Sequence, residues 1–333
     1  MGDYVPPFKI TAKSITLIAE ISAQLERYAI RMEQSDSIKL RKANRIKTIQ
    51  GSLAIEGNTL SEDQITAILE GKNIIAPKRE VQEVRNAIKT YDRFAAWNPY
   101  SVKDLLEAHE SMMTGLIDES GIFRHGGVGV LAGTQVIHLA PPADRVPFLI
   151  KDLLEWLERS DDHPLVKSSV FHYEFEFIHP FADGNGRMGR LWQTLILTAW
   201  KPVFAHVPIE NMVYAHQGEY YQAINESTEK TDAGIFVEFL LGSVLEALVS
   251  HREPTPEVTP GVTPEVKKLL NVFKKAEELT RKELQDRLGL KDEKNFRQKY
   301  LLPALAGRQI EMTVPDKPNS RLQKYKRTER SQQ

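Results

Sequence analysis

The stretch that decides the fold reads Ile-His-Pro-Phe-Ala-Asp-Gly-Asn-Gly-Arg-Met-Gly-Arg and covers residues 178–190. Before it, apolar residues recur at three- and four-residue steps from Val166 to Phe177, a spacing that predicts a buried helix. Pro180 must end that helix, because proline disfavours the helical conformation at the residue before it. The same apolar spacing returns from Leu191 to Ala199. The stretch is therefore a tight connection between two buried helices.

The residues of this connection suit an anion. Gly184, Asn185 and Gly186 allow a backbone whose N–H groups turn inward at the positive N-terminal end of the second helix. Arg187 and Arg190 are three residues apart, which places them on one side of the first turn and extends the positive field. We expect a triphosphate to bind here.

Two further side chains of the connection suit chemistry on such a ligand. Asp183 supplies a hard oxygen ligand of the kind that Mg²⁺ takes beside substrate phosphates. His179 lies at the opposite lip, where a neutral imidazole can accept a proton from an incoming hydroxyl. A base, a metal ligand and an anion site thus fall within one short segment.

Residues 179–190 match every fixed position of the motif His-x-Phe-x-(Asp/Glu)-Gly-Asn-Gly-Arg-x-x-Arg, and in this the chain resembles the Fic (filamentation induced by cAMP) family. Most active members of that family transfer AMP from ATP to a Ser, Thr or Tyr hydroxyl of a target protein. The resemblance extends over nearly the whole chain. It implies a Mg²⁺-dependent protein adenylyltransferase that uses ATP and modifies target proteins and itself.

The resemblance also implies a role for each residue of the motif. His179 would be the catalytic base, and Asp183 would hold Mg²⁺ between the α- and β-phosphates. Arg187 would contact the β-phosphate and Arg190 the γ-phosphate. The other implied nucleotide contacts lie on the loop, on the start of the second helix and on one tyrosine beside the adenosine: Gly184, Asn185, Gly186, Met188, Gly189 and Tyr220. Related Doc-type proteins carry lysine in place of Gly186 and transfer the γ-phosphate instead.

The same resemblance implies functions for two other segments. A hairpin before the motif would dock the target segment by strand addition, along Val136, Ile137, His138 and Leu139. Ser52-Leu-Ala-Ile-Glu56-Gly57 fits the family's inhibitory signature (Ser/Thr)-x-x-x-Glu-(Gly/Asn), in which the glutamate holds the second arginine of the motif, here Arg190, away from the γ-phosphate. The alternative is that Glu56 is only a surface carboxylate near Gly57, a helix stop.

The chain is divided into two parts of different charge. Residues 264–333 carry 18 Lys and Arg against 10 Asp and Glu, a net charge of +8. Because the whole chain has a net charge of −1, the remainder carries −9. The Pro-rich segment 251–264 separates the two parts and favours an extended linker.

Apolar spacing before the linker is mostly helical. Ser61 is expected to cap the start of a helix that ends at Gly71. Ser101 is expected to cap a helix that runs to about Leu116. Residues 123–142 are the exception and predict a short β-hairpin. After the linker we expect helices from Pro264, from Thr280 and over 292–306, then strands at 310–314 and 322–326.

Three helices followed by a hairpin are the element order of a winged helix. The expected fold is mainly α: a Fic-fold helical bundle with a short β-hairpin flap, plus a C-terminal winged-helix domain. Its divisions are an N-terminal helical region with the inhibitory motif at 1–100, a catalytic core at 101–250, the linker at 251–264 and the winged helix at 265–333.

Three other interpretations of the motif fit the residues less well. Residues 184–189 match the dinucleotide-binding pattern Gly-x-Gly-x-x-Gly of NAD enzymes. That pattern follows a β-strand, whereas a helical pattern precedes it here. His172, Glu174, Glu176 and His179 suggest a zinc hydrolase, yet they do not form His-Glu-x-x-His, and His172 is expected to be a packing histidine. A purely structural loop explains the glycines but not the clustered charges.

Composition excludes several classes of protein. The chain has no cysteine, which excludes disulfide scaffolds and thiolate metal sites. The apolar stretch 236–249 is broken by Glu238 and Glu246, so it predicts a core helix rather than a membrane span. The first residues lack the features of a signal peptide, and Pro6 stands where a myristoylation signal has Ser or Thr. We expect a cytoplasmic protein that does not bind a membrane.

Further functions stay open at this stage. Relatives with the inhibitory glutamate can remove AMP, with Glu56 positioning a water. The chain could instead be a DNA-binding regulator whose Fic core senses nucleotide, with basic and polar residues of the winged helix gripping the duplex: Lys294, Asn295, Arg297, Gln298, Lys299, Lys317 and Arg321. A homodimer is also left open.

Overall fold

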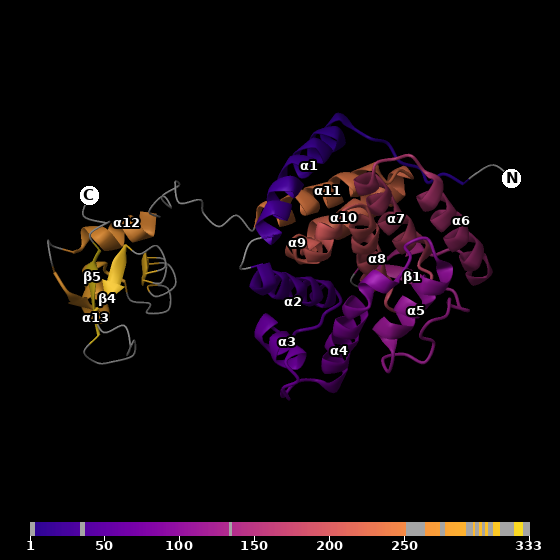
Figure 1. Cartoon of the computed structure of the whole chain (residues 1–333). Helices are drawn as coiled ribbons and strands as arrows, with labels where there is room; N and C mark the ends of the chain where they lie inside the picture. Colours follow the sequence, from indigo (N-terminus) through magenta and orange to yellow (C-terminus); the bar gives the residue numbers. More distant parts are fainter. Residues whose placement is uncertain are drawn as a thin grey trace. The chain divides into compact units, whose positions relative to one another are not determined.

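The chain folds as two compact units, residues 1–251 and 252–333, in a computed structural model (Figure 1). The structure describes residues 4–33, 37–132, 135–250, 264–273, 277–290, 296, 300–301, 304–305, 309–313 and 323–328. The expected linker thus lies almost wholly outside the described residues. A division of the first unit near residue 100 stays a prediction.

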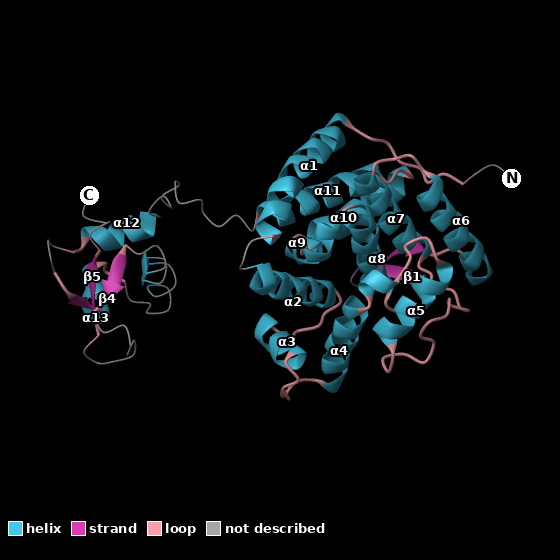
Figure 2. Cartoon of the chain, in the orientation of Figure 1, coloured by secondary structure: helices cyan, strands magenta, loops and turns pink. Residues whose placement is uncertain are grey.

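The first unit is built almost entirely of helices (Figure 2). Its α-helices are α1 Ala12–Met32, α2 Ser37–Ile55, α3 Glu62–Leu69, α4 Lys78–Asp92, α5 Val102–Met113, α6 Val146–Arg159, α7 Pro164–Ile178, α8 Asn185–Trp200, α9 Ile209–Ala215, α10 Gln217–Lys230 and α11 Gly234–Val249. Short 3₁₀ helices are η1 Phe94–Ala96, η2 Ala143–Arg145 and η3 Pro202–His206. Strands β1 Gly129–Ala132 and β2 Gln135–Leu139 form the expected antiparallel hairpin.

Helices α7 and α8 form the centre of this unit and pack against each other. Both are buried around most of their circumference, as expected of helices that are enclosed by other helices. Helix α11 packs against α7 and α1, so the prediction of a core helix at 236–249 is confirmed. Within the described residues, no helix has the length and the hydropathy that a membrane crossing needs.

Local capping signals fixed several helix starts. Ser61 and Gln64 form the expected capping box of α3, and Ser101 caps α5. The expectation of a helix to Leu116 was wrong by one turn, because α5 ends at Met113 and Thr114 leaves the helical conformation.

The second unit contains two described helices, α12 Pro264–Asn271 and α13 Arg281–Arg287, and one antiparallel sheet. The sheet has the order β3-β5-β4, with β3 Leu279–Thr280, β4 Ile310–Met312 and β5 Lys324–Arg327. Strand β3 was not expected. Most of the expected helix 292–306, and all seven residues proposed for DNA contact, lie outside the described residues.

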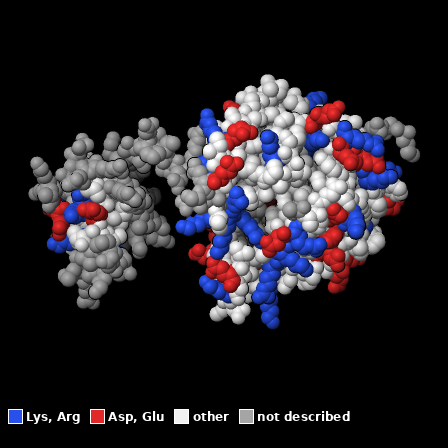
Figure 3. All heavy atoms as spheres, viewed as in Figure 1, with Lys and Arg blue, Asp and Glu red and all other residues white. Residues whose placement is uncertain are grey.

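Basic side chains of α2 are balanced by acidic neighbours. Lys42 contacts Glu70 at 2.8 Å and Arg45 contacts Asp92 at 2.6 Å. On the face drawn in Figure 3, Lys and Arg side chains lie beside Asp and Glu over much of this unit. Such exposed pairs contribute only about 0–1 kcal/mol each, so the stability of the unit comes from its core.

Helices α2 and α9 approach each other through a glycine. A Cβ atom on Gly51 would lie 2.7 Å from the backbone N and Cα of Asn211, so no larger residue fits without moving the helices. Beside this contact, the buried carboxyl of Glu210 accepts hydrogen bonds from Thr194 Oγ1 (3.0 Å) and Tyr91 OH (3.2 Å). Burial raises the pKa of Glu210 to about 7.

Replacing Gly51 with alanine should therefore destabilise the first unit by about 1–3 kcal/mol, since the methyl group forces the two backbones apart. The matched control is Gly242→Ala in α11, where a Cβ meets nothing within 4 Å. There the better helix propensity of alanine should stabilise by about 0.5–1 kcal/mol. Urea unfolding midpoints measure both. A Gly51→Ala protein as stable as wild type would contradict the close approach.

The raised pKa of Glu210 makes part of the stability pH-dependent. At a pH between the unfolded pKa of about 4.3 and the native pKa, Glu210 holds a proton in the folded state that it has released in the unfolded state. Stability from this group is thus lost as pH rises from 5 to 8. Glu210→Gln removes this loss, so the variant should gain on the order of 2 kcal/mol relative to wild type over that range. Urea midpoints at both pH values test it. Parallel pH profiles would refute it.

Candidate active site

Helix α7 ends abruptly at the first residue of the motif. His179 adopts a left-handed conformation (φ 50°), and its backbone N–H donates to the carbonyl of Phe175 at 2.9 Å. The imidazole is half-buried, and Nδ1 lies 3.4 Å from the carbonyl oxygen of Glu176. Because a carbonyl only accepts, this contact favours the tautomer with the proton on Nδ1. Nε2 then carries the lone pair.

The loop that follows is closed by an amide side chain. Asn185 Nδ2 donates to the carbonyl of Phe181, and Asn185 Oδ1 accepts from the N–H of Phe181, both at 2.9 Å. Asn185 is buried, so its side chain holds the loop in shape, and a contact with phosphate stays a prediction. Gly184 has φ +84°, the left-handed conformation that favours glycine, and caps the start of α8.

A histidine supports this loop from α5. His109 is buried and stacks on Phe181, with ring centroids 3.6 Å apart. Its Nδ1 accepts from the N–H of Gly121 (2.9 Å), so Nε2 carries the proton and donates to the carbonyl of Asp183 (3.0 Å). Burial lowers the pKa of His109 to about 4, which keeps it neutral. His109 is thus a packing histidine that supports the loop.

Asp183 lies at the rim of the loop, with its side chain 43% exposed. Its Oδ1 accepts from the N–H of Gly184 (2.6 Å) and from Arg187 Nη2 (3.1 Å), and Arg79 Nη2 of α4 lies 3.5 Å from Oδ2. The carboxylate is thus oriented by its neighbours and accessible from solvent.

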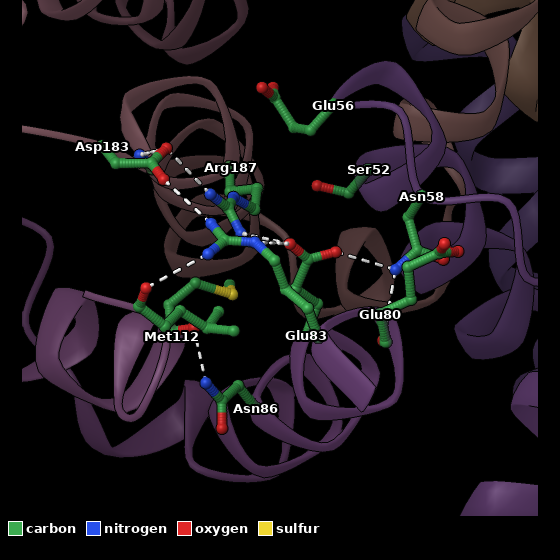
Figure 4. Close-up of polar contacts among 12 residues, drawn as sticks. Ser52, Glu56, Asn58, Glu80, Glu83, Asn86, Met112, Asp183 and Arg187 are labelled. Atoms are coloured by element: carbon green, nitrogen blue, oxygen red, sulfur yellow. Dashed lines mark hydrogen bonds and ion pairs between the residues drawn. The ribbon is translucent and has the colours of Figure 1, made fainter. Parts of the chain in front are cut away.

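The two arginines of the motif contact different carboxylates. Arg187 is buried, with Nη1 3.9 Å from Glu83 Oε1 of α4 on the side away from Asp183. Figure 4 shows Glu83 between Arg187 and Asn58, whose Nδ2 donates to Glu83 Oε2 at 2.8 Å. The segment that follows α2 is thereby linked to the motif.

Arg190 contacts the C-terminal end of α2. Its Nη2 lies 2.6 Å from Glu56 Oε1 and donates to the carbonyl of Ser52 at 3.0 Å, and its Nε donates to Ser52 Oγ at 3.3 Å. Burial lowers the pKa of Arg190, but the negative charge of Glu56 and further neighbours more than offsets it, so the net pKa is raised. Gly57 (φ +90°) ends α2, so it is a helix stop beside a carboxylate that also contacts the motif.

Gly186 lies directly under this ion pair. A Cβ atom there would be 2.4 Å from Glu56 Oε1 and 2.9 Å from Arg190 Nη1. A larger residue here would thus displace the end of the Glu56 or the Arg190 side chain from the present contact.

A polar cluster is buried beneath the first turn of α8. His172 Nδ1 lies 2.8 Å from Gln193 Oε1 and its Nε2 lies 3.2 Å from the hydroxyl of Tyr220. Burial lowers the pKa of His172 to about 3 and raises that of Glu176 to about 7, so His172 is neutral above about pH 3 and Glu176 is protonated below about pH 7. His172 is the packing histidine expected. Among the described residues, no three His, Cys, Asp or Glu side chains could hold a metal on their own.

Tyr220 is buried and faces this cluster. Its neighbour Tyr221 is the more exposed of the two tyrosines. The adenosine contact of Tyr220 stays a prediction.

The hairpin places the expected docking strand opposite β1. Val136 pairs with Leu131, His138 with Val130 and Leu139 with Gly129, and Ile137 lies between them on β2. The side chains of this strand lie outside the described residues, so target docking stays a prediction.

Several residues of the site carried no signal in the sequence: Arg79, Glu83, His109 and Arg124. The first two belong to a helix whose polar positions look like a solvated face, and Arg124 stands alone between an aromatic residue and the hairpin. Only their contacts in the folded chain distinguish them from surface residues.

Comparison with known families gives two matches. The sequence model of the Fic/DOC family matches residues 99–197. That of the "Filamentation induced by cAMP protein Fic-like, C-terminal domain" matches residues 264–328.

Relatives and solved structures agree with these matches. "Protein adenylyltransferase Fic" of Aedes aegypti is 30% identical over 250 residues, 69% of this chain and 48% of the relative. "Protein adenylyltransferase fic-1" of Caenorhabditis elegans is 31% identical over 190 residues, 52% of this chain and 35% of the relative. The chain thus spans about half the length of these relatives, or less.

A solved Fic family protein from Desulfovibrio desulfuricans G20 is 48% identical, with a TM-score of 0.73, and the match covers 98% of this chain and 99% of that one. Fic-1 (aa134–508) of C. elegans shares the fold at 24% identity and a TM-score of 0.56, over 71% of each chain. Motif, fold and relatives agree, and this chain belongs to the Fic family.

Proposed function

We propose that this chain is a protein adenylyltransferase that transfers AMP from ATP to a Ser, Thr or Tyr hydroxyl of a target protein. One observation carries the proposal: a half-buried imidazole, an accessible carboxylate and two buried guanidinium groups surround the N-terminus of α8. The adenylyltransferase relatives support the same activity.

The phosphates of ATP would bind at the N-terminus of α8. The free N–H groups of its first turn and the helix dipole favour an anion there. Arg187 and Arg190 add two buried positive charges, which interact with a phosphate more strongly than exposed ones do. We assign the β-phosphate to Arg187 and the γ-phosphate to Arg190.

Asp183 fits a magnesium ion that arrives with the nucleotide. One accessible carboxylate, with no further acidic cluster in the described part of the chain, suits Mg²⁺ held by substrate phosphates rather than by a protein cage. Bound there, Mg²⁺ would neutralise phosphate charge.

His179 would act as the base of the transfer. Nε2 takes the proton from the target hydroxyl, whose oxygen attacks the α-phosphorus of ATP. The bond from the α-phosphorus to the bridging oxygen breaks, and pyrophosphate leaves. The protein contributes position and fixed positive charge.

Glu56 would restrain this reaction. Its carboxylate occupies the guanidinium fork of Arg190 that the γ-phosphate needs, and it repels a triphosphate near the helix start. The slow form of the enzyme is thus the form with the ion pair intact.

Removal of AMP is a second candidate activity. The side chain of Glu56 is 34% exposed, so its carboxylate could position a water beside Arg190 of the motif. Incubation of AMP-modified chain without ATP distinguishes the two, because release of AMP under those conditions requires the reverse activity.

The proposed transfer predicts which label moves. Protein should be labelled by ATP carrying the label in the α-phosphate and not by ATP carrying it in the γ-phosphate. His179→Ala should lower incorporation by roughly 10²-fold or more, the usual contribution of a general base, while ATP affinity stays near wild type. Transfer of the γ-label would overturn the assignment, and a loss of ATP affinity alone would make His179 a ligand.

Release of the restraint should accelerate the transfer. A charge-assisted hydrogen bond is worth about 1.5–3 kcal/mol, so Glu56→Gly should raise initial AMP incorporation by roughly 10- to 100-fold. Adding Arg190→Ala should abolish most of that gain, since the freed arginine orients the γ-phosphate.

The matched control for this experiment is Glu62→Gly, which removes an exposed carboxylate at the start of α3. It should leave the rate near wild type. Equal rates for wild type and Glu56→Gly would contradict the inhibitory role and leave residues 52–57 as an ordinary helix terminus.

A further inference from the structure

Arg124 is a buried arginine outside the motif, and its guanidinium faces backbone carbonyl groups. Nε donates to the carbonyl of His179 (2.7 Å) and Nη2 to that of Ile178 (3.2 Å). Nη1 donates to the carbonyl of Gly126 (2.8 Å), and Nη2 also reaches that of Pro141 (2.5 Å). One planar group thus binds four carbonyl oxygens from three segments.

Two of these carbonyls belong to the end of α7. The last carbonyl groups of a helix have no partner within it and form the negative end of its dipole. Those of Ile178 and His179 meet a cation there, and the backbone N–H of Arg124 donates to the carbonyl of Pro180 at 3.0 Å. Three successive carbonyls of the turn that carries His179 are therefore held by one residue.

The other two carbonyls flank the hairpin. Beyond the β1–β2 pairing, the N–H of Ala140 donates to the carbonyl of Val128 at 3.2 Å, so Gly126 and Pro141 stand just outside the last pairs. The hairpin is joined at its base, on both strands, to the turn of His179.

We propose that Arg124 is a positioning residue that fixes the target-docking hairpin relative to His179. The inference rests on the proposed transfer together with the expected docking of the target along β2, which would bring the hydroxyl of the paired segment to Nε2. A misplacement of about 1 Å is enough to lower a rate about 10²-fold, so a rigid link between hairpin and base is required. Lysine cannot replace it, because an ammonium lacks the planar fork that reaches four acceptors.

The test compares Arg124→Lys with its parent in the Glu56→Gly background. The acceptor is a tagged His179→Ala copy of this chain, labelled in trans with α-labelled ATP. We expect the maximal rate divided by the KM for the acceptor to fall about 10- to 100-fold, while the KM for ATP stays within about twofold. Arg145→Lys, an exposed arginine in η2, is the matched control and should change neither value.

Hydrogen exchange gives a second measurement that does not depend on activity. In Arg124→Lys, peptides covering 125–141 should exchange faster, while those of α8 at 185–200 stay protected. Faster exchange throughout the first unit would mean a general loss of stability and would overturn the positioning role.

The outcomes separate this inference from the proposed function. An active parent with an unchanged Arg124→Lys variant overturns the inference alone. A parent that labels no protein overturns the proposed transfer, and the positioning role with it.

Discussion

The structure depends on ion pairs between carboxylates and two guanidinium groups that are buried at the positive end of a helix. Arg187 and Arg190 are desolvated next to the N-terminus of α8, where the helix dipole opposes a further positive charge. Carboxylates offset this: Asp183 and Glu83 for the first, Glu56 for the second. Because phosphates carry charge of the same sign as these carboxylates, the proposed nucleotide binding and the proposed restraint would meet the same electrostatic requirement.

That requirement explains how the N-terminal helices belong to the site. Glu56 comes from the end of α2 and Glu83 from α4, and Asn58 links the two segments through Glu83. Both helices also contribute to the single core of the first unit. The contact between Glu56 and Arg190 is thus supported by the packing of these helices.

Prediction from the sequence was confirmed where structure is local. The connection between α7 and α8 lies in one short segment, and the caps at Ser61 and Ser101 need only a few neighbouring residues. The chemical roles of His179, Asp183 and the two arginines stay predictions. It failed where a partner is distant or is a backbone group. The carbonyls that Arg124 binds leave no mark on residue type, and strand β3 exists only because β5 pairs with it.

Gly186 shows how one position bears on both the proposed restraint and the proposed nucleotide binding. Its missing side chain leaves room for Glu56 Oε1, which a Cβ would approach to 2.4 Å. A lysine at this position would therefore expel the carboxylate and place its own ammonium in the space that the helix start offers to phosphate. A side chain here would therefore require the ends of the Glu56 and Arg190 side chains to move from their present contact. The glycine thus permits the close approach of Glu56 to Arg190 and, in the proposed function, leaves the same space for phosphate.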